Sequence, residues 1–310
     1  MFRAMPHDHA HHGHSHLDPE AGDRRIVAAV GVNLILTVAQ IAGGILSGSI
    51  ALVADAIHNL SDALALVIAF VARRIARRPA DDTMTFGYGR AETVAALVNY
   101  TTLIVIGLWL GFEAIMRMFD PPDVTGWIVV VLAGVALVID LATVALTYSM
   151  SKHSTNIRAA FLHNLADAMS SVVVIVAGTL ILLYDWRLVD PIATLAISGY
   201  ILWHSAVEVV PVIRLLMLGT PPRIDRDEVR EAMAAIDGVA GVHHLHLWQI
   251  DERRLSVEAH VVVAHGRSVE FPALCRRIKA CLRDRFDIAH STLEMELPGS
   301  GCACGDSPAA

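Results

Sequence analysis

Residues 49–72 read SIALVADAIHNLSDALALVIAFVA, a stretch that is long enough and apolar enough to cross a membrane as a helix. Two ionisable residues, His58 and Asp62, lie near its middle, four positions apart. A helix places such residues one above the other, about 6 Å apart along its axis. Because ionisable groups are costly inside a membrane, this pair predicts a functional site.

A second apolar stretch repeats the pattern. His163 and Asp167 are also four positions apart, and both pairs share the motif His-Asn-Leu-x-Asp. Together the pairs supply two imidazoles and two carboxylates, a set that suits a four-coordinate dication such as Zn²⁺. Magnesium or calcium would favour oxygen ligands alone. The alternative, that each pair is only an intrahelical hydrogen bond, is disfavoured by the repetition.

The composition is that of an integral membrane protein. Hydrophobic residues make up 55% of the 310 residues, and the mean hydropathy is +0.53. Six apolar segments are each near the ~20 residues that a spanning helix needs. These segments are residues 26–46, 49–72, 91–116, 126–150, 157–184 and 189–217. The net charge of −7 and the lack of a basic stripe give no support for nucleic-acid binding.

Arginine and lysine placement predicts the orientation, since positively charged loops stay in the cytoplasm. These residues lie before the first segment, between the second and third, around the turn between the fourth and fifth, and after the sixth. They are Arg24, Arg25, Arg73, Arg74, Arg77, Arg78, Arg90, Lys152, Arg158, Arg214 and Arg223. The opposite side has only Arg117 and Arg187 nearby. We expect both termini in the cytoplasm of a bacterial cell, with the helices in its inner membrane.

The pattern changes to that of a soluble domain after residue 218. Amphipathic helices are predicted over residues 225–236 and 269–286, and alternating strands over residues 242–250, 255–263 and 289–297. The order α-β-β-α-β predicts a small α+β domain. The chain is thus divided into a disordered tail (1–23), a six-helix membrane domain (24–218), a cytoplasmic domain (219–297) and a flexible C-terminal tail (298–310).

Asp55 and Asp140, two of the other carboxylates in the apolar segments, are candidates for a supporting role at the predicted membrane site. Asp55 is three residues before His58, on the same helix face, and could orient that imidazole. Its alternative role is that of a membrane-interface residue near the Ser47-Gly48 turn. Asp140 is a lone carboxylate in the fourth segment, and such groups usually face a polar cavity.

The soluble domain and the tails contain more potential ligands. If the strands pair, His243, His260 and His290 could meet in a regulatory metal site with Glu294 or Glu296 nearby. The alternative is that these are ordinary strand histidines. The tails contain flexible ligands that suit low-affinity metal gathering: His7, His9, His11, His12, His14, His16, Cys302 and Cys304. A purification tag is the alternative for the first group, although interruptions by Asp, Ala, Gly and Ser favour a native sequence.

Further motifs accompany the six segments and the two His-x-x-x-Asp pairs. They are Phe86-Gly87-Tyr88-Gly89-Arg90-Ala91-Glu92, Asp190-Pro191 and Val242-His243-His244-Leu245-His246-Leu247-Trp248. In this order and spacing, residues 24–297 resemble the cation diffusion facilitator family of divalent-metal efflux transporters.

The resemblance implies a homodimer in the lipid membrane with one transport site per protomer, made by His58, Asp62, His163 and Asp167. It also implies a ferredoxin-like, metallochaperone-like cytoplasmic domain that dimerises. The histidine at the first ligand position of the second helix resembles the pattern of the zinc-preferring branch of the family. Some relatives carry metal-binding histidines in the loop between the second and third helices, which residues 81–88 lack.

We therefore predict a transporter, not an enzyme, that exports Zn²⁺ in exchange for protons; Cd²⁺, Co²⁺ or Ni²⁺ also suit the ligands. Metal and protons compete because the ligands must be deprotonated to bind, and protonation of His58 or His163 would release the ion. Alternating access would come from rocking of helix groups. The rival is a membrane-anchored metal sensor or storage protein. An intramembrane metalloprotease is disfavoured because no His-Glu-x-x-His motif occurs.

Overall fold

The structure is a computed structural model that describes residues 19–151, 155–264 and 271–299. Within these ranges the chain forms eight helices and three strands. It divides into two compact units, Met1–Ala63 with Arg117–Ala193, and Leu64–Met116 with Thr194–Ala310. Helices α2, α3 and α6 each contribute residues to both units.

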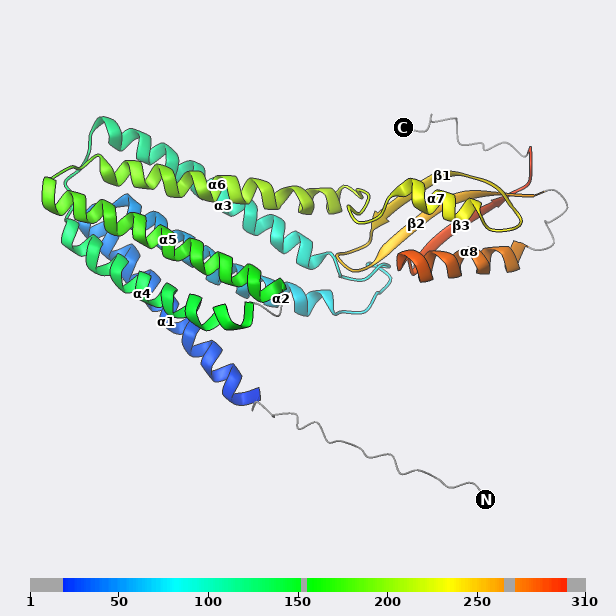
Figure 1. Ribbon diagram of the computed structural model, residues 1–310, viewed down its shortest axis with the longest axis horizontal. Coiled ribbons are helices and arrows are strands. Elements are labelled where there is room, and N and C mark those ends of the chain that lie inside the picture. The colour runs from blue at the N-terminus through cyan, green and yellow to red at the C-terminus, as the bar shows by residue number, and fades with distance from the viewer. Residues whose placement is uncertain (1–18, 152–154, 265–270, 300–310) are drawn as a thin grey trace, which may run out of the picture. The chain divides into compact units, whose positions relative to one another are not determined.

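The first unit is helical. It contains α1 (Pro19–Ser47), the start of α2 (Ile50–Ala76), α4 (Gly126–Ser151), α5 (Thr155–Tyr184) and the start of α6 (Val189–Leu216). Figure 1 shows α4 and α5 side by side. Two glycines permit this contact: a Cβ on Gly126 would lie 2.7 Å from the Gly178 carbonyl oxygen, and one on Gly178 would lie 2.9 Å from Val129.

Asp190 fixes the beginning of α2. Its carboxylate accepts hydrogen bonds from the Ser49 hydroxyl and from the backbone N–H groups of Ile50 (2.9 Å) and Ala51 (3.4 Å). The first N–H groups of a helix have no partner within the helix, and an anion there also favours the helix dipole. The Asp190-Pro191 motif therefore positions the helix that carries His58 and Asp62.

The second unit combines membrane helices with the α/β domain. It contains the rest of α2, most of α3 (Ala91–Phe119) and most of α6. Helices α3 and α6 approach closely at Gly107, where a Cβ would lie 2.9 Å from the Leu202 side chain.

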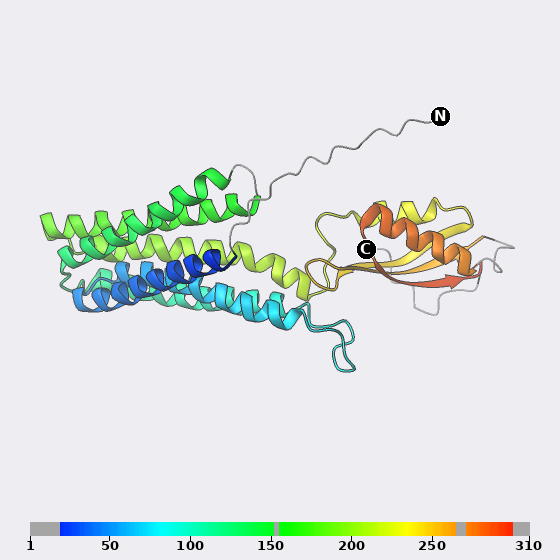
Figure 2. The same cartoon turned by 90° about the horizontal axis from the view of Figure 1, so that it is seen from below.

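The α/β domain contains α7 (Arg226–Ala234), β1 (Val239–Gln249), β2 (Leu255–Val263), α8 (Phe271–Phe286) and β3 (His290–Glu296). The sheet order is β1-β2-β3, with β1 and β2 antiparallel and β2 and β3 parallel. Helices α7 and α8 lie on the same face of the sheet (Figure 2). The expected α-β-β-α-β order is confirmed.

Helical and strand periodicity build the core of this domain. Leu274, Ile278 and Leu282 recur every four residues on α8 and are fully buried, and Val229 and Met233 do the same on α7. The central strand β2 contributes Val257, Ala259, Val261 and Val263.

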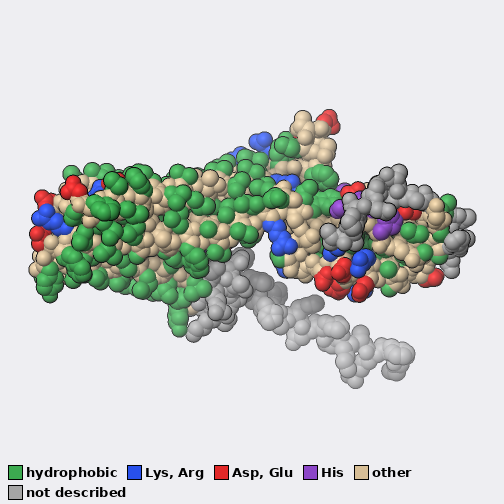
Figure 3. All heavy atoms as spheres, turned by 90° about the horizontal axis from the view of Figure 1, so that it is seen from above, with side chains coloured by type: hydrophobic (Ala, Val, Ile, Leu, Met, Phe, Trp, Pro, Cys, Tyr) green, Lys and Arg blue, Asp and Glu red, His purple; other side chains and the backbone are tan. Residues whose placement is uncertain are grey.

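Five of the described helices are long and apolar enough to cross a membrane: α2, α3, α4, α5 and α6. In α1, a shorter apolar stretch spans Leu34–Ser47. Helix α1 begins at Pro19, so residues 19–23, expected in the tail, are helical. Hydrophobic side chains cover much of the helical surface (Figure 3), as lipid contact requires.

Candidate metal centres

Three of the four ligands expected in the membrane lie together within the first unit. His58 and Asp62 come from α2 and Asp167 from α5, and one ligand atom of each lies within 4.8 Å of the others. His58 Nε2 is 3.4 Å from Asp167 Oδ1 and 3.7 Å from Asp62 Oδ2. His58 and Asp167 are buried and Asp62 is partly buried.

These separations fit a tetrahedral ion. Ligand atoms about 2.0–2.2 Å from a tetrahedral zinc lie roughly 3.3–3.6 Å from one another. The 3.4 and 3.7 Å separations therefore need only small side-chain movements to accept an ion. The fourth expected ligand, His163, belongs to α5 one turn before Asp167, but its side chain lies outside the described residues.

Polar residues of neighbouring helices form hydrogen bonds next to this group. Asp55 accepts hydrogen bonds from the Gln40 amide (3.0 Å) and the Ser170 hydroxyl (2.7 Å), which link α2 to α1 and α5. Asp140 of α4 accepts a hydrogen bond from the adjacent Ser171 (3.0 Å). Ser170 and Ser171 follow Asp167 by about one helical turn, so both bonds hold the segment of α5 that carries this ligand.

A second group forms in the α/β domain, where the Glu296 carboxylate bridges two histidines. His243 Nε2 lies 2.9 Å from Glu296 Oε2, and His260 Nδ1 lies 2.6 Å from Glu296 Oε1. His260 is buried, whereas the His243 side chain is 42% exposed. The exposed face of His243 gives an ion access from solvent. Figure 3 shows histidine side chains at the surface of the domain.

Glu296 is ionised at neutral pH. Its burial opposes ionisation, but hydrogen bonds with His260 and His243 outweigh this effect and hold the pKa of its carboxyl below the usual value. Two imidazoles and one carboxylate are a donor set that binds zinc and leaves one position open.

The expectation that His290 joins this group is wrong. Parallel pairing of β3 with β2 places His290 opposite Ser256, four residues or about 13 Å from His260 along the strand. His290 instead packs edge-on against Phe86, with ring centroids 5.5 Å apart. Glu294 pairs with His260, and its Oε2 lies 3.5 Å from His260 Nε2.

Strand alternation also fails at His244. The register of β1 shifts between His243 and His246, and one extra residue there makes a β-bulge. His244 has φ 53°. Its ring centroid lies 5.1 Å from that of His260, so His243 and His244 both approach His260 instead of pointing to opposite faces.

The remaining regions to consider are the two tails, which contain predicted ligands, and the loop between α2 and α3, which lacks the histidines of some relatives. The N-terminal histidines and the Cys302 and Cys304 thiols lie outside the described residues. In the loop between α2 and α3, Asp81 is engaged locally: it accepts hydrogen bonds from Thr83, Met84 and Tyr88, which lower the pKa of its carboxyl. Among the described residues this loop contributes to neither potential metal group.

Comparison with known proteins identifies the family. Residues 26–217 match the family model described as the cation efflux transmembrane domain, and residues 221–297 match the cation efflux protein, cytoplasmic domain. The chain is 37% identical to the zinc transporter ZitB of Pectobacterium atrosepticum, over 92% of this chain and 88% of that protein.

Two other similar proteins are informative. A Bacillus velezensis protein named cadmium, cobalt and zinc/H(+)-K(+) antiporter is 33% identical, over 94% of this chain and 92% of its own length. The metal-bound C-terminal domain of the CzcD transporter from Cuprividus metallidurans is 35% identical, covering 24% of this chain and all of its own, with a TM-score of 0.22. By its two matched domains, the chain belongs to the cation efflux family, the cation diffusion facilitators.

Proposed function

We propose that this protein exports a divalent cation, Zn²⁺ in the first place, in exchange for protons. The observation that carries the proposal is the buried group of His58, Asp62 and Asp167 within apolar helices, at separations that suit a tetrahedral ion. His163 is proposed as the fourth ligand because it lies one turn from Asp167 on α5.

Proton coupling follows from the chemistry of these ligands. Imidazole and carboxylate bind a metal only when deprotonated, so a proton and a metal ion compete for the site. Histidine suits this exchange because an imidazole can both bind a metal ion and take up a proton, and the proposed set contains His58 and His163. The names of two relatives, a zinc transporter and a metal/proton antiporter, support both the cargo and the counter-ion.

The proposed setting is a homodimer in a bacterial inner membrane with both termini in the cytoplasm. The match of residues 221–297 to a cytoplasmic domain of efflux proteins supports this orientation. The arginines around the α2–α3 loop support it independently, by the positive-inside rule. We further propose that His243, His260 and Glu296 bind a regulatory metal ion on the cytoplasmic side.

A flux assay tests the transport proposal. The purified chain is reconstituted in liposomes that are acidic inside and contain a fluorescent zinc indicator, and zinc is added outside. We expect zinc uptake that collapses when a protonophore removes the pH gradient. Tight stoichiometric zinc binding without any flux would instead support a membrane-anchored sensor or storage protein, the rival from another class.

Asp55 is expected to support the transport site without binding the ion itself. The Asp55→Asn variant loses the negative charge of the carboxylate, which accepts hydrogen bonds from Gln40 and Ser170. Residues that support metal ligands typically contribute 10–100-fold to affinity, so we expect the half-saturating zinc concentration to rise by about that factor. The liposome assay measures it.

A matched pair of variants makes the Asp55 test specific. Ser170→Ala removes one of the two hydrogen bonds and should give a smaller shift in the same direction. Asp120→Asn changes an exposed carboxylate and should give none. An unchanged half-saturating concentration in Asp55→Asn would show that Asp55 does not position the site.

A further inference from the structure

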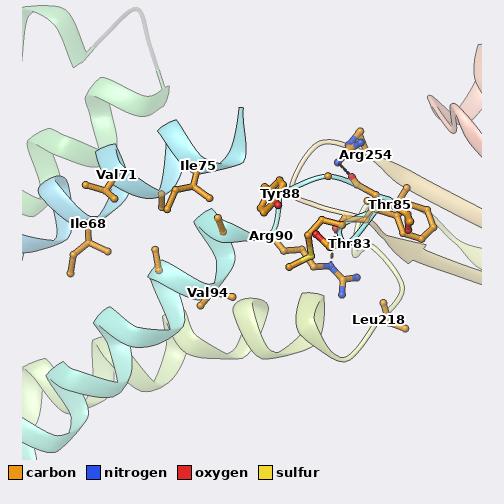
Figure 4. Close-up of a pocket in the computed structure, with 18 of the residues that line it drawn as sticks. Ile68, Val71, Ile75, Thr83, Thr85, Tyr88, Arg90, Val94, Leu218 and Arg254 are labelled. Atoms are coloured by element: carbon orange, nitrogen blue, oxygen red, sulfur yellow. Dashed lines mark hydrogen bonds between the residues drawn. The ribbon is translucent and has the colours of Figure 1, made fainter. Parts of the chain in front are cut away.

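A large cavity in the second unit lies outside both metal groups. It has a volume of about 970 Å³, at the upper end of the range of ligand pockets. The end of α2, the start of α3, the loop between them and the Trp248 region of the α/β domain line it. Figure 4 shows Ile68, Val71 and Ile75 from α2 and Val94 from α3 around this space.

The walls of this cavity continue the lipid-facing surface of two spanning helices. Val67, Val71 and Ile75 recur every four residues on α2, and Val94 lies on the first turn of α3. Val67, Val71 and Val94 are each about half exposed, at 55%, 51% and 49%. An apolar strip thus runs from the membrane span into the cavity, open to an acyl chain from the bilayer.

Two arginines follow the apolar strip: Arg74 lies in the last turn of α2, and Arg78 lies two residues beyond the end of that helix. Arg74 follows Val67 by seven residues, which is nearly two helical turns, so it lies on the same face of α2, and both arginines are exposed. The Arg78 guanidinium lies 6.0 Å from the ring centroid of Tyr88, a residue that lines the cavity. Positive charge therefore lies beyond the end of the apolar strip.

The inner arginines of the cavity hold its wall together. Arg90 donates hydrogen bonds to the backbone carbonyls of Ile250 (2.9 Å) and Gln249 (3.1 Å). Arg254 donates to the Phe86 carbonyl (2.9 Å) and to Asp251 (2.7 Å). Because both guanidinium groups already form hydrogen bonds within the protein, few polar groups in the cavity are left to bind a compact polar ligand. The apolar lining instead suits an apolar chain.

We propose that this cavity binds an anionic phospholipid, with an acyl chain against Val71, Val94 and Trp248 and the headgroup phosphate beside Arg74 and Arg78. Basic residues beside a membrane span attract anionic headgroups. An anionic amphiphile fits this arrangement, because its acyl chain matches the apolar strip and its negative headgroup matches the arginines. A second copy of the chain would need a complementary apolar and acidic surface, and it is the competing occupant in the test.

Lipid binding to the full-length protein provides the first test. Native mass spectrometry is used to titrate phosphatidylglycerol and phosphatidylcholine with identical acyl chains. We expect preferential binding of phosphatidylglycerol, weakened about fivefold for each arginine removed and hence about 25-fold in Arg74→Gln/Arg78→Gln.

The helix provides a matched control. Arg73→Gln/Arg77→Gln removes the same charge from residues that are also four apart, and Arg73 lies on a face of α2 rotated by about 100° from that of Arg74. It should weaken phosphatidylglycerol binding much less than Arg74→Gln/Arg78→Gln does. Equal binding of the two lipids, or equal effects of the two double variants, would overturn the proposal.

A second measurement locates the lipid. In a variant with Trp109, Trp127, Trp186 and Trp203 replaced by Phe, only Trp248 remains. Phosphatidylglycerol with brominated acyl chains should quench its fluorescence, and Arg74→Gln/Arg78→Gln should abolish the quenching. Absence of quenching, together with a shift from dimer to monomer in Val71→Asp, would show that a second copy fills the cavity and would refute the proposal.

Discussion

Asp62→Asn and Asp167→Asn should each reduce zinc flux at least about a hundredfold. Residues that merely support a metal ligand contribute 10–100-fold to affinity, and loss of a direct ligand exceeds this. Asp167 lies 3.4 Å from His58 and Asp62 lies 3.7 Å from it, so each substitution removes one anionic donor from the same small group. Initial rates in the acid-inside liposome assay measure the effect.

The control for these variants is Asp120→Asn, an exposed carboxylate on the same chain, which should transport like the unaltered protein. Thermal unfolding in detergent establishes that all variants are folded. Undiminished flux in both Asp62→Asn and Asp167→Asn would show that the buried group is not part of the transport pathway. It would not affect the lipid proposal, whose readout is binding at a separate cavity.

Glu296→Gln should abolish most zinc binding by the α/β domain, with a loss of affinity of about a hundredfold. Glu296 contacts both His243 and His260, and its amide replacement cannot supply the anionic bridge. Calorimetry on the full-length chain carrying Asp62→Asn isolates the domain site, because the transport site is then disabled.

Glu294→Gln is the matched control, with the same chemistry two residues away on β3. Glu294 is 67% exposed, and its Oε2 lies 3.5 Å from His260 Nε2, a looser contact than that of Glu296. We expect its effect on zinc affinity to be several-fold smaller. Equal losses in the two variants would place the ion elsewhere on the domain.

Helical and strand periodicity made most of the fold predictable. Apolar length located the spanning segments, and alternation located the strands, to within a few residues of the observed ends, except that α1 begins at Pro19 and not at residue 26. The matched His-x-x-x-Asp pairs singled out His58, Asp62 and Asp167 because a helix fixes which residues share a face. Gln40, Ser170 and Ser171 are polar residues within apolar helices, but their hydrogen-bond partners come from other helices.

The site in the α/β domain was only partly predictable. The sequence located three strands rich in histidine, but not their register. A bulge at His244 and the parallel register of β3 replaced His290 with Glu296 as the third member of the group. A shift of one residue changes which side chains meet, and the pairing of distant strands determines that shift.

The sequence by itself determined the membrane helices, the soluble domain and the identity of the buried pairs, because these depend on periodicity within single segments. Only the tertiary structure decided which segments meet. It joined α2 to α5 at Asp167, placed Asp55 between Gln40 and Ser170, and formed the apolar cavity that Val71, Val94 and Trp248 line. These contacts depend on packing between residues far apart in the chain, which local periodicity does not encode.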